Sequence, residues 1–411
     1  MSSQPAVLRG PANAVLQRSE TVRKTPFTPW PAFEQDEIDI VREVLASGKI
    51  NYWTGQEGRL FEQEYAAHVG TRYAVAVSNG TVALELALET LGIGVGDEVI
   101  VPSRTFLATA SCVAMRGAIP VFADVDRESQ NITAETIRSL IRPRTRAVIV
   151  VHLAGWPCDM DSILELTREC NLKVIEDCAQ AHGAMYKGRH IGSLGDVGAF
   201  SFCQDKIMTT GGEGGLITTN DEETWRRAWS FKDHGKNYDA VYNRQHPAGF
   251  KWLHESIGTN WRLTEMQSAL GRILLRKLPA RVQLRRRNAA KLNELFATDP
   301  AVRLTVPPSH CYHTYYKYYF FLRPEALRAE AERETIIEEI NAEGVPCFSG
   351  SCSEIYLEKA FPASWRPKVR HAVAMELGNT ALMFLVHHTL TEADMADTHA
   401  AVTKVLNRYR N

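Results

Sequence analysis

Apolar, β-branched runs alternate with stretches of helical spacing between Tyr73 and Asn220, and this alternation limits the possible folds more than any other feature. The predicted strands are 74–77, 99–101, 120–125, 147–151, 173–175, 198–202 and 216–218. Helices are predicted between most of them, over 81–91, 105–116, 134–142 and 159–170. Such alternation is typical of a mainly parallel sheet that helices cover on both faces. We therefore expect an α/β fold, with ligands at the strand ends.

The flanking parts of the chain predict an arm and a second domain. Residues 1–31 carry four cations and one acid and lack the apolar stretch of a secretory signal, so we expect a flexible N-terminal arm. An organelle transit peptide is a less favoured alternative. We assign residues 32–262 to the large domain and residues 263–411 to a smaller C-terminal α+β domain.

The smaller domain begins with helical spacing from Thr264 to Leu278, where we expect Pro279 to end or kink the helix. The later predicted elements are a helix over 281–296, a strand over 315–322, a helix over 332–343, a strand over 382–386 and a helix over 392–408.

The composition argues against several classes of protein. The net charge is −1, so no overall field attracts nucleic acid or an anionic membrane. No apolar run approaches the roughly 18 residues that a membrane span needs. The eight cysteines form no C-x-x-C pair and no His cluster accompanies them. We therefore expect free thiols in a reducing cytoplasm, and no metal site.

One acid and one lysine each follow a predicted strand, near glycine-rich turns. Asp177 follows the run 172–176, and Lys206 comes shortly after the strand over 198–202, ahead of the glycines at 211–215. This pair suits pyridoxal phosphate chemistry, in which a lysine forms an imine with the cofactor aldehyde and an acid keeps the pyridine nitrogen protonated. Either residue alone is more often a cap or a solvated side chain, but here both would lie at the rim of a buried sheet.

Several segments resemble, in order, the DegT/StrS-type sugar aminotransferases, which are fold-type I pyridoxal phosphate enzymes. They read SNGTVAL at 78–84, PSRTF at 102–106, EDCAQAHG at 176–183 with the lysine-containing stretch up to 215, and GTNWR at 258–262. The resemblance extends from about Phe33 to the C-terminus. It implies that Lys206 and Asp177 are catalytic. Because some family members carry His at the lysine position and are sugar dehydratases, Lys206 favours transamination.

The turn from Ser78 to Thr81 joins a predicted strand to a predicted helix. Gly80 lets the backbone approach a ligand, and the first N–H groups of the helix, from Thr81, are free to bind a phosphate. From the local sequence alone, an ordinary helix cap by Ser78 or Asn79 explains the turn equally well. The resemblance implies that Gly80 and Thr81 bind the cofactor phosphate.

The resemblance also implies roles for four further residues. Phe106 would stack on the pyridine ring, although an aromatic residue at helical spacing more often belongs to the core. Gln180 would contact the phenolic oxygen of the cofactor, and Ser201 its phosphate. Asn260 would reach the cofactor phosphate of a partner subunit, which implies a homodimer with shared active sites.

Residues 232–262 predict a long loop rich in cations and aromatic residues, and loops of this length are usually functional or disordered. Its cations could bind a substrate diphosphate, and Tyr238 or Trp252 could stack on a nucleobase. Alternatively, these residues cover a subunit interface or face water. Arg262 is one candidate for binding the donor carboxylate. The diphosphate candidates are Lys232, Lys236, Arg244 and Lys251.

The resemblance implies an aminotransferase that moves an amino group from L-glutamate or L-glutamine to a nucleotide-linked ketosugar. A 4-keto-6-deoxy hexose is expected first, a 3-keto sugar next and a free cyclitol third. Two alternatives stay open: another enzyme of this architecture, such as a cyclitol or keto-acid aminotransferase or a dehydratase, and a non-enzymatic regulator that senses the cofactor. The presence of both Lys206 and Asp177 argues against the regulator.

Overall fold

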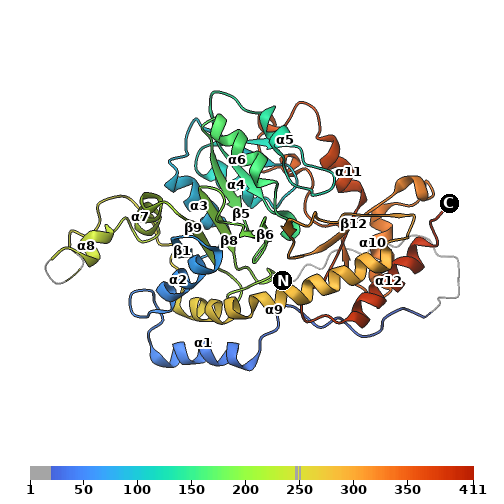
Figure 1. The fold of residues 1–411 in the computed structure, drawn as a ribbon, viewed down its shortest axis with the longest axis horizontal. Coiled ribbons are helices and arrows are strands. Elements are labelled where there is room, and N and C mark those ends of the chain that lie inside the picture. Colours follow the sequence, from blue (N-terminus) through green and yellow to red (C-terminus); the bar gives the residue numbers. More distant parts are fainter. Residues whose placement is uncertain (1–19, 246–248, 250) are drawn as a thin grey trace, which may run out of the picture.

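The computed structural model describes residues 20–245, 249 and 251–411, and is organised around a seven-stranded sheet (Figure 1). The strand order is β1-β9-β8-β5-β4-β2-β3. Only β9 runs antiparallel to its neighbours, so the expected mainly parallel sheet is confirmed. The strands are β1 (Tyr73–Val77), β2 (Glu98–Pro102), β3 (Ile119–Ala123), β4 (Thr145–Val151), β5 (Lys173–Asp177), β8 (Val197–Ser201) and β9 (Gly215–Thr219).

Helices cover this sheet on both faces, which explains why its strands are apolar throughout. In β4, Ala147 and Ile149 pack into one core, whereas Val148 and Val150 pack into another on the opposite face. The side chains of a strand alternate between faces, so both faces must be apolar. The helices that follow the strands are α3 (Gly80–Thr90), α4 (Ala108–Met115), α5 (Ala134–Arg138), α6 (Met160–Glu169) and α7 (Glu222–Phe231).

The segment before β8, expected to be loop-like, contains a short hairpin. Its strands, β6 (Met185–Tyr186) and β7 (Arg189–His190), form a small sheet with β11 (Cys311–Tyr312). Two-residue strands leave too little periodicity in the sequence to be recognised.

The C-terminal part has a four-stranded sheet and an apolar core of its own. The strand order is β10-β12-β14-β13. The elements are β10 (Val302–Leu304), β12 (Tyr318–Leu322), β13 (Cys347–Phe348), β14 (Ala381–Phe384), α10 (Arg333–Ala342), α11 (Ala372–Thr380) and α12 (Glu392–Leu406).

A single long helix, α9 (Glu265–Phe296), connects the two parts and runs through Pro279 without ending. The expectation of two helices separated at Pro279 is therefore wrong. Proline removes one helical hydrogen bond, but Leu278 and Val282 on either side of it are buried. Helix α9 packs on α1 (Gln35–Ser47), α2 (Glu57–Val69) and α12, and this packing holds the helix together across the proline (Figure 1).

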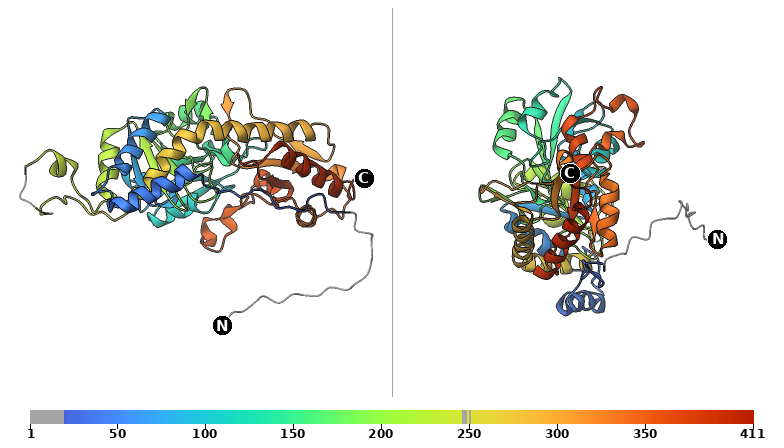
Figure 2. Two further views of the ribbon diagram at one scale, coloured as in Figure 1. Left: turned by 90° about the horizontal axis from the view of Figure 1, so that it is seen from below. Right: turned by 90° about the vertical axis from the view of Figure 1, so that its right-hand side faces the viewer.

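Residues 20–31, here called the N-terminal strap, lie against the C-terminal part. Arg23 pairs with Asp394 and Asp397 at 2.8 Å each, and the backbone N–H of Val22 donates to Glu343 Oε2 at 3.1 Å. Residues 1–19 of the expected arm lie outside the described residues. At the other end of the molecule, α8 (Tyr238–Tyr242) projects away from the central sheet (Figure 2). Among the described helices, none is both long and apolar enough to cross a membrane.

Candidate active site

Asp177 is the last residue of β5, and its carboxylate is buried. The Thr109 hydroxyl on α4 donates to Oδ2 at 2.9 Å, and the backbone N–H of Ala179 donates to Oδ1 at 3.2 Å. Burial raises the pKa of Asp177, and these two bonds and the charge of Lys206 offset this only in part. A carboxylate in this position gains from a cationic hydrogen-bond partner, as a protonated pyridine nitrogen would be.

Lys206 lies in the turn after β8, half-buried, and three contacts define its surroundings. Its Nζ lies 4.9 Å from the centroid of the Tyr316 ring. The Tyr316 hydroxyl in turn donates to the Asp205 carboxylate. On the other side, the Trp30 indole N–H donates to the Lys206 carbonyl at 2.9 Å. The strap and the segment before β12 therefore both position the lysine.

The start of α3 touches the end of β8 and leaves no room for a side chain. A Cβ at Gly80 would lie 2.4 Å from Ser201 Cβ, so glycine is required here. Asn79 caps the helix by accepting the Val82 N–H at 3.0 Å. The two sequence interpretations of this turn are therefore compatible, because the earlier N–H groups of α3, at Gly80 and Thr81, can still bind a phosphate.

Phe106 lies shortly after the end of β2, and Gln180 lies shortly after the end of β5. Phe106 precedes α4 with 68% of its surface exposed, and its carbonyl accepts the N–H of Thr109, the residue that binds Asp177. An exposed ring one helical turn from this threonine suits a stacking role. Gln180 is buried, and its Oε1 accepts the Ala154 N–H at 2.9 Å.

Asn260 is exposed and forms a β-bridge with Asp233. The carbonyl of the next residue, Trp261, accepts the Ser78 N–H at 2.9 Å, so Asn260 lies beside the turn from Ser78 to Thr81 in its own chain. Its contact with a partner subunit stays a prediction.

The cations at the start of the loop 232–262 are not available to a substrate. Lys232 is buried and pairs with Glu62 at 2.6 Å, and Lys236 is buried and pairs with Asp233 at 2.8 Å. The expectation that these two lysines bind a diphosphate is therefore wrong, because each compensates a carboxylate inside the protein. Arg262 also pairs with Asp233, at 2.6 Å.

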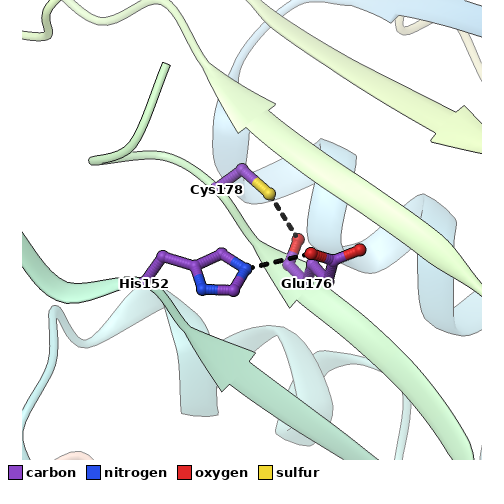
Figure 3. A group of neighbouring side chains, drawn as sticks. All are labelled: His152, Glu176 and Cys178. Carbon is purple, nitrogen blue, oxygen red and sulfur yellow. Dashed lines mark hydrogen bonds and ion pairs between the residues drawn. The ribbon is translucent and has the colours of Figure 1, made fainter. Parts of the chain in front are cut away.

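A second cluster, at the ends of β4 and β5, consists of His152, Glu176 and Cys178 (Figure 3). Glu176 accepts the His152 Nε2–H at 3.0 Å and the backbone N–H groups of the turn 192–195 at 2.7–2.8 Å. His152 Nδ1 accepts the Cys158 N–H, which fixes the tautomer. Burial raises the pKa of Glu176, but these bonds lower it below its usual value. With its oxygens occupied, Glu176 holds the turn 192–195 in place.

Residues 31–403 match the model of the DegT/DnrJ/EryC1/StrS aminotransferase family. The chain belongs to this family. A GDP-perosamine synthase of Caulobacter vibrioides is 36% identical over 394 residues, 92% of this chain and 97% of that protein. An L-glutamine:2-deoxy-scyllo-inosose aminotransferase of Streptoalloteichus tenebrarius is 34% identical over 421 residues, 97% of this chain and 99% of that protein. The X-ray structure of an aminotransferase from Psychrobacter cryohalolentis is 53% identical, covers 94% of this chain and 100% of that one, and has a TM-score of 0.92.

The enzyme is a pyridoxal phosphate-dependent aminotransferase, and its residues fit that cofactor. The buried Asp177 offers a carboxylate to the ring nitrogen, and the first N–H groups of α3, at Gly80 and Thr81, lie beside Ser201 and can bind a phosphate. Three residues of the site were not predicted from the sequence: Trp30, Thr109 and Tyr316. Thr109 had a usable signal, since it lies one turn after Phe106 in a predicted helix.

Proposed function

We propose that this enzyme transfers an amino group from L-glutamate or L-glutamine to a nucleotide-linked ketosugar, with a 4-keto-6-deoxy hexose as the first candidate. The observation that carries the proposal is the position of Lys206 and the buried Asp177 at the ends of neighbouring strands, in a chain that matches an aminotransferase family over 31–403. The GDP-perosamine synthase at 36% identity supports a nucleotide-linked substrate.

When bound, pyridoxal phosphate supplies an aldehyde that takes up the amino group and a ring that withdraws electrons. Asp177 holds the ring nitrogen protonated, and Thr109 orients the carboxylate. With the cofactor bound, the Lys206 amine would remove the proton from the donor α-carbon and would later return one to the sugar carbon. The donor leaves as a 2-oxo acid, and the ketone of the acceptor becomes an amine.

A free cyclitol is the second candidate acceptor, because the inosose aminotransferase is nearly as similar, at 34% identity over 97% of this chain. Identity alone does not separate the two substrate classes. The burial of Lys232 and Lys236 also leaves fewer cations for a diphosphate than the sequence indicated. Lys251 and Trp252 are exposed and still fit a nucleotide, with 84% of the Trp252 surface accessible.

The discriminating experiment compares acceptors in the second stage of the reaction. Enzyme loaded with pyridoxamine phosphate is mixed with a nucleotide-linked 4-keto-6-deoxy hexose, the same sugar without its nucleotide, and an inosose. We expect the nucleotide sugar to react fastest and the Lys206→Ala variant to react with none of them. An equal or faster rate with the free sugar or the inosose would reject the nucleotide-sugar proposal. Failure of L-glutamate and L-glutamine to change the cofactor spectrum would reject transamination and favour a regulator.

A further inference from the structure

A cavity of about 500 Å³ lies between the N-terminal strap and the C-terminal part of the chain. It adjoins the backbone of the segment that carries Lys206. Trp30 lines the cavity and donates its indole N–H to the Lys206 carbonyl, and Asp205, the residue before Lys206, lines it as well. A molecule in this cavity would therefore lie beside the backbone that carries Lys206.

The wall of the cavity carries a lysine whose charge is incompletely compensated. The side chain of Lys317 is only 15% exposed, and its nearest acid is Asp205, at 3.7 Å. The Asp205 carboxylate is shared, since it also accepts the Tyr316 hydroxyl. Burial lowers the pKa of Lys317, and the charges of Arg285 and Lys206 lower it further, against the opposing effect of Asp205. A buried cation of this kind is stabilised by an added anion.

A second buried cation makes the local charge more positive. Arg285 on α9 is 1% exposed, and its Nε and Nη2 have no hydrogen-bond partner within the described ranges. Its Nη1 donates to the Tyr316 carbonyl at 3.3 Å, so the guanidinium lies behind the same segment that carries Lys317.

The other basic groups of the cavity wall are already neutral or paired. Arg23 is held by two carboxylates of α12, and Lys24 is exposed and paired with Glu20 at 3.2 Å. Burial lowers the pKa of His387 to about 3, so its ring is neutral. Lys317 is thus the cation of this wall whose charge is least compensated. One such cation suits a ligand with a single carboxylate better than a diphosphate. Phe27, Trp30, Val345 and Leu385 supply apolar surface for a short carbon chain.

We propose that this cavity binds the side-chain carboxylate of the amino donor, with Lys317 as its ion-pair partner. The inference rests on the proposed function in taking L-glutamate as the donor. The Nζ atoms of Lys206 and Lys317 lie 4.9 Å and 4.8 Å from the centroid of the same Tyr316 ring, so at most the sum of these distances separates them. An extended glutamate spans roughly 6 Å from its amino nitrogen to its side-chain carboxylate. With a hydrogen bond of about 2.9 Å added, its reach of about 9 Å is comparable with the largest separation that these distances allow.

The test measures donor binding apart from turnover. Glutarate, which has both carboxylates of the donor carbon chain and no amino group, is titrated calorimetrically into the holoenzyme. We expect Lys317→Met to lower both the affinity for glutarate and the rate of the first stage, amino transfer from L-glutamate to the cofactor, by about tenfold or more. Lys317→Arg should restore much of the loss. The second stage, with the ketosugar acceptor, should change by less than about twofold. Lys24→Met, in the same wall but exposed and already paired, is the matched control and should bind glutarate normally.

Two outcomes would overturn the inference while leaving the proposed function intact. One is undiminished glutarate binding in Lys317→Met, or no binding to the parent holoenzyme. The other is a loss confined to the second stage, which would make the cavity part of the acceptor site. Circular dichroism and urea unfolding of both variants identify a folding defect. If Lys317→Met is misfolded, the glutarate affinity of Lys317→Arg tests the inference instead. Failure of the proposed function would give a different result: the parent enzyme would aminate no ketosugar.

Discussion

Gly80 and Ser201 lie so close that a Cβ on Gly80 would be 2.4 Å from Ser201 Cβ. Because that neighbour is bonded directly to the backbone of β8, Gly80→Ala must move either the strand end or the start of α3. We expect a loss of cofactor affinity of at least about tenfold and a fall in the free energy of unfolding of about 1–3 kcal/mol. Absorbance titration with pyridoxal phosphate and urea unfolding measure the two effects.

Gly94→Ala is the matched control, since a Cβ there meets only the Arg116 carbonyl, at an ordinary 3.5 Å. It should bind the cofactor normally. Normal affinity in Gly80→Ala as well would show that this contact does not shape the phosphate site.

The carboxylate of Asp177 opposes folding when no cofactor is bound. Burial raises its pKa in the folded protein above the usual 3.8, so the folded state holds this proton more tightly than the unfolded chain. Stability therefore falls as the pH rises from 3.8 through the folded-state pKa, and above that range the ionised carboxylate destabilises the apoprotein. We expect the Asp177→Asn apoprotein to be more stable than the parent at neutral pH, with the difference shrinking toward pH 3.8.

The turnover rate of Asp177→Asn should fall, although its apoprotein is expected to be more stable. Asp177→Asn should lose about 100-fold or more in rate, because nothing then holds the ring nitrogen protonated. Urea unfolding across pH and steady-state rates supply the two measurements. A variant that is less stable at neutral pH, or one that turns over normally, would contradict this role.

Lys232 is a structural cation whose removal should destabilise the fold. Its Nζ lies 2.6 Å from Glu62 Oε1, and the two side chains are 1% and 10% exposed. Lys232→Met leaves that carboxylate without its cation, which costs about 3–5 kcal/mol for a buried pair. Adding Glu62→Gln should recover part of the loss. Unchanged stability in Lys232→Met, with weakened nucleotide binding, would instead return Lys232 to the substrate site.

Asn260 is expected to complete the active site of a partner subunit, which makes the enzyme a two-fold dimer. Mixing inactive Lys206→Ala chains with Asn260→Ala chains should restore up to one intact site per mixed dimer. Mixing Lys206→Ala with Asp177→Asn is the control and should restore none, because both residues act within one chain. No gain in the first mixture, or full activity of a monomer by light scattering, would contradict the shared site.

The strands, and the placement of Asp177 and Lys206 at the ends of neighbouring strands, could be predicted because their signals are local. Asp177 and Lys206 each follow an apolar run long enough to identify as a strand, and the strand ends then bring them together. The bounds of α9 could not be predicted in this way. The sequence around Pro279 indicates a break, and only packing against α1, α2 and α12 overrides it.

Contacts between distant segments had no signal in the sequence. The bond between Trp30 and Lys206 joins residues 176 positions apart, and the pair of Lys232 with Glu62 joins residues 170 positions apart. In the sequence of a cation-rich loop, nothing distinguishes a surface lysine from a lysine that is buried and paired. For that reason the sequence overestimated the cations available to a diphosphate.

The most direct test of the account locates the cofactor on the chain. The holoenzyme is reduced with borohydride, digested and analysed by mass spectrometry, with a parallel sample treated first with excess L-glutamate. We predict that the pyridoxyl group is attached to Lys206 in the first sample and is missing from that peptide in the second. Attachment to another lysine, such as the neighbouring Lys317, or a label on Lys206 that the donor does not remove, would contradict the assignment of Lys206 as the catalytic lysine of an aminotransferase.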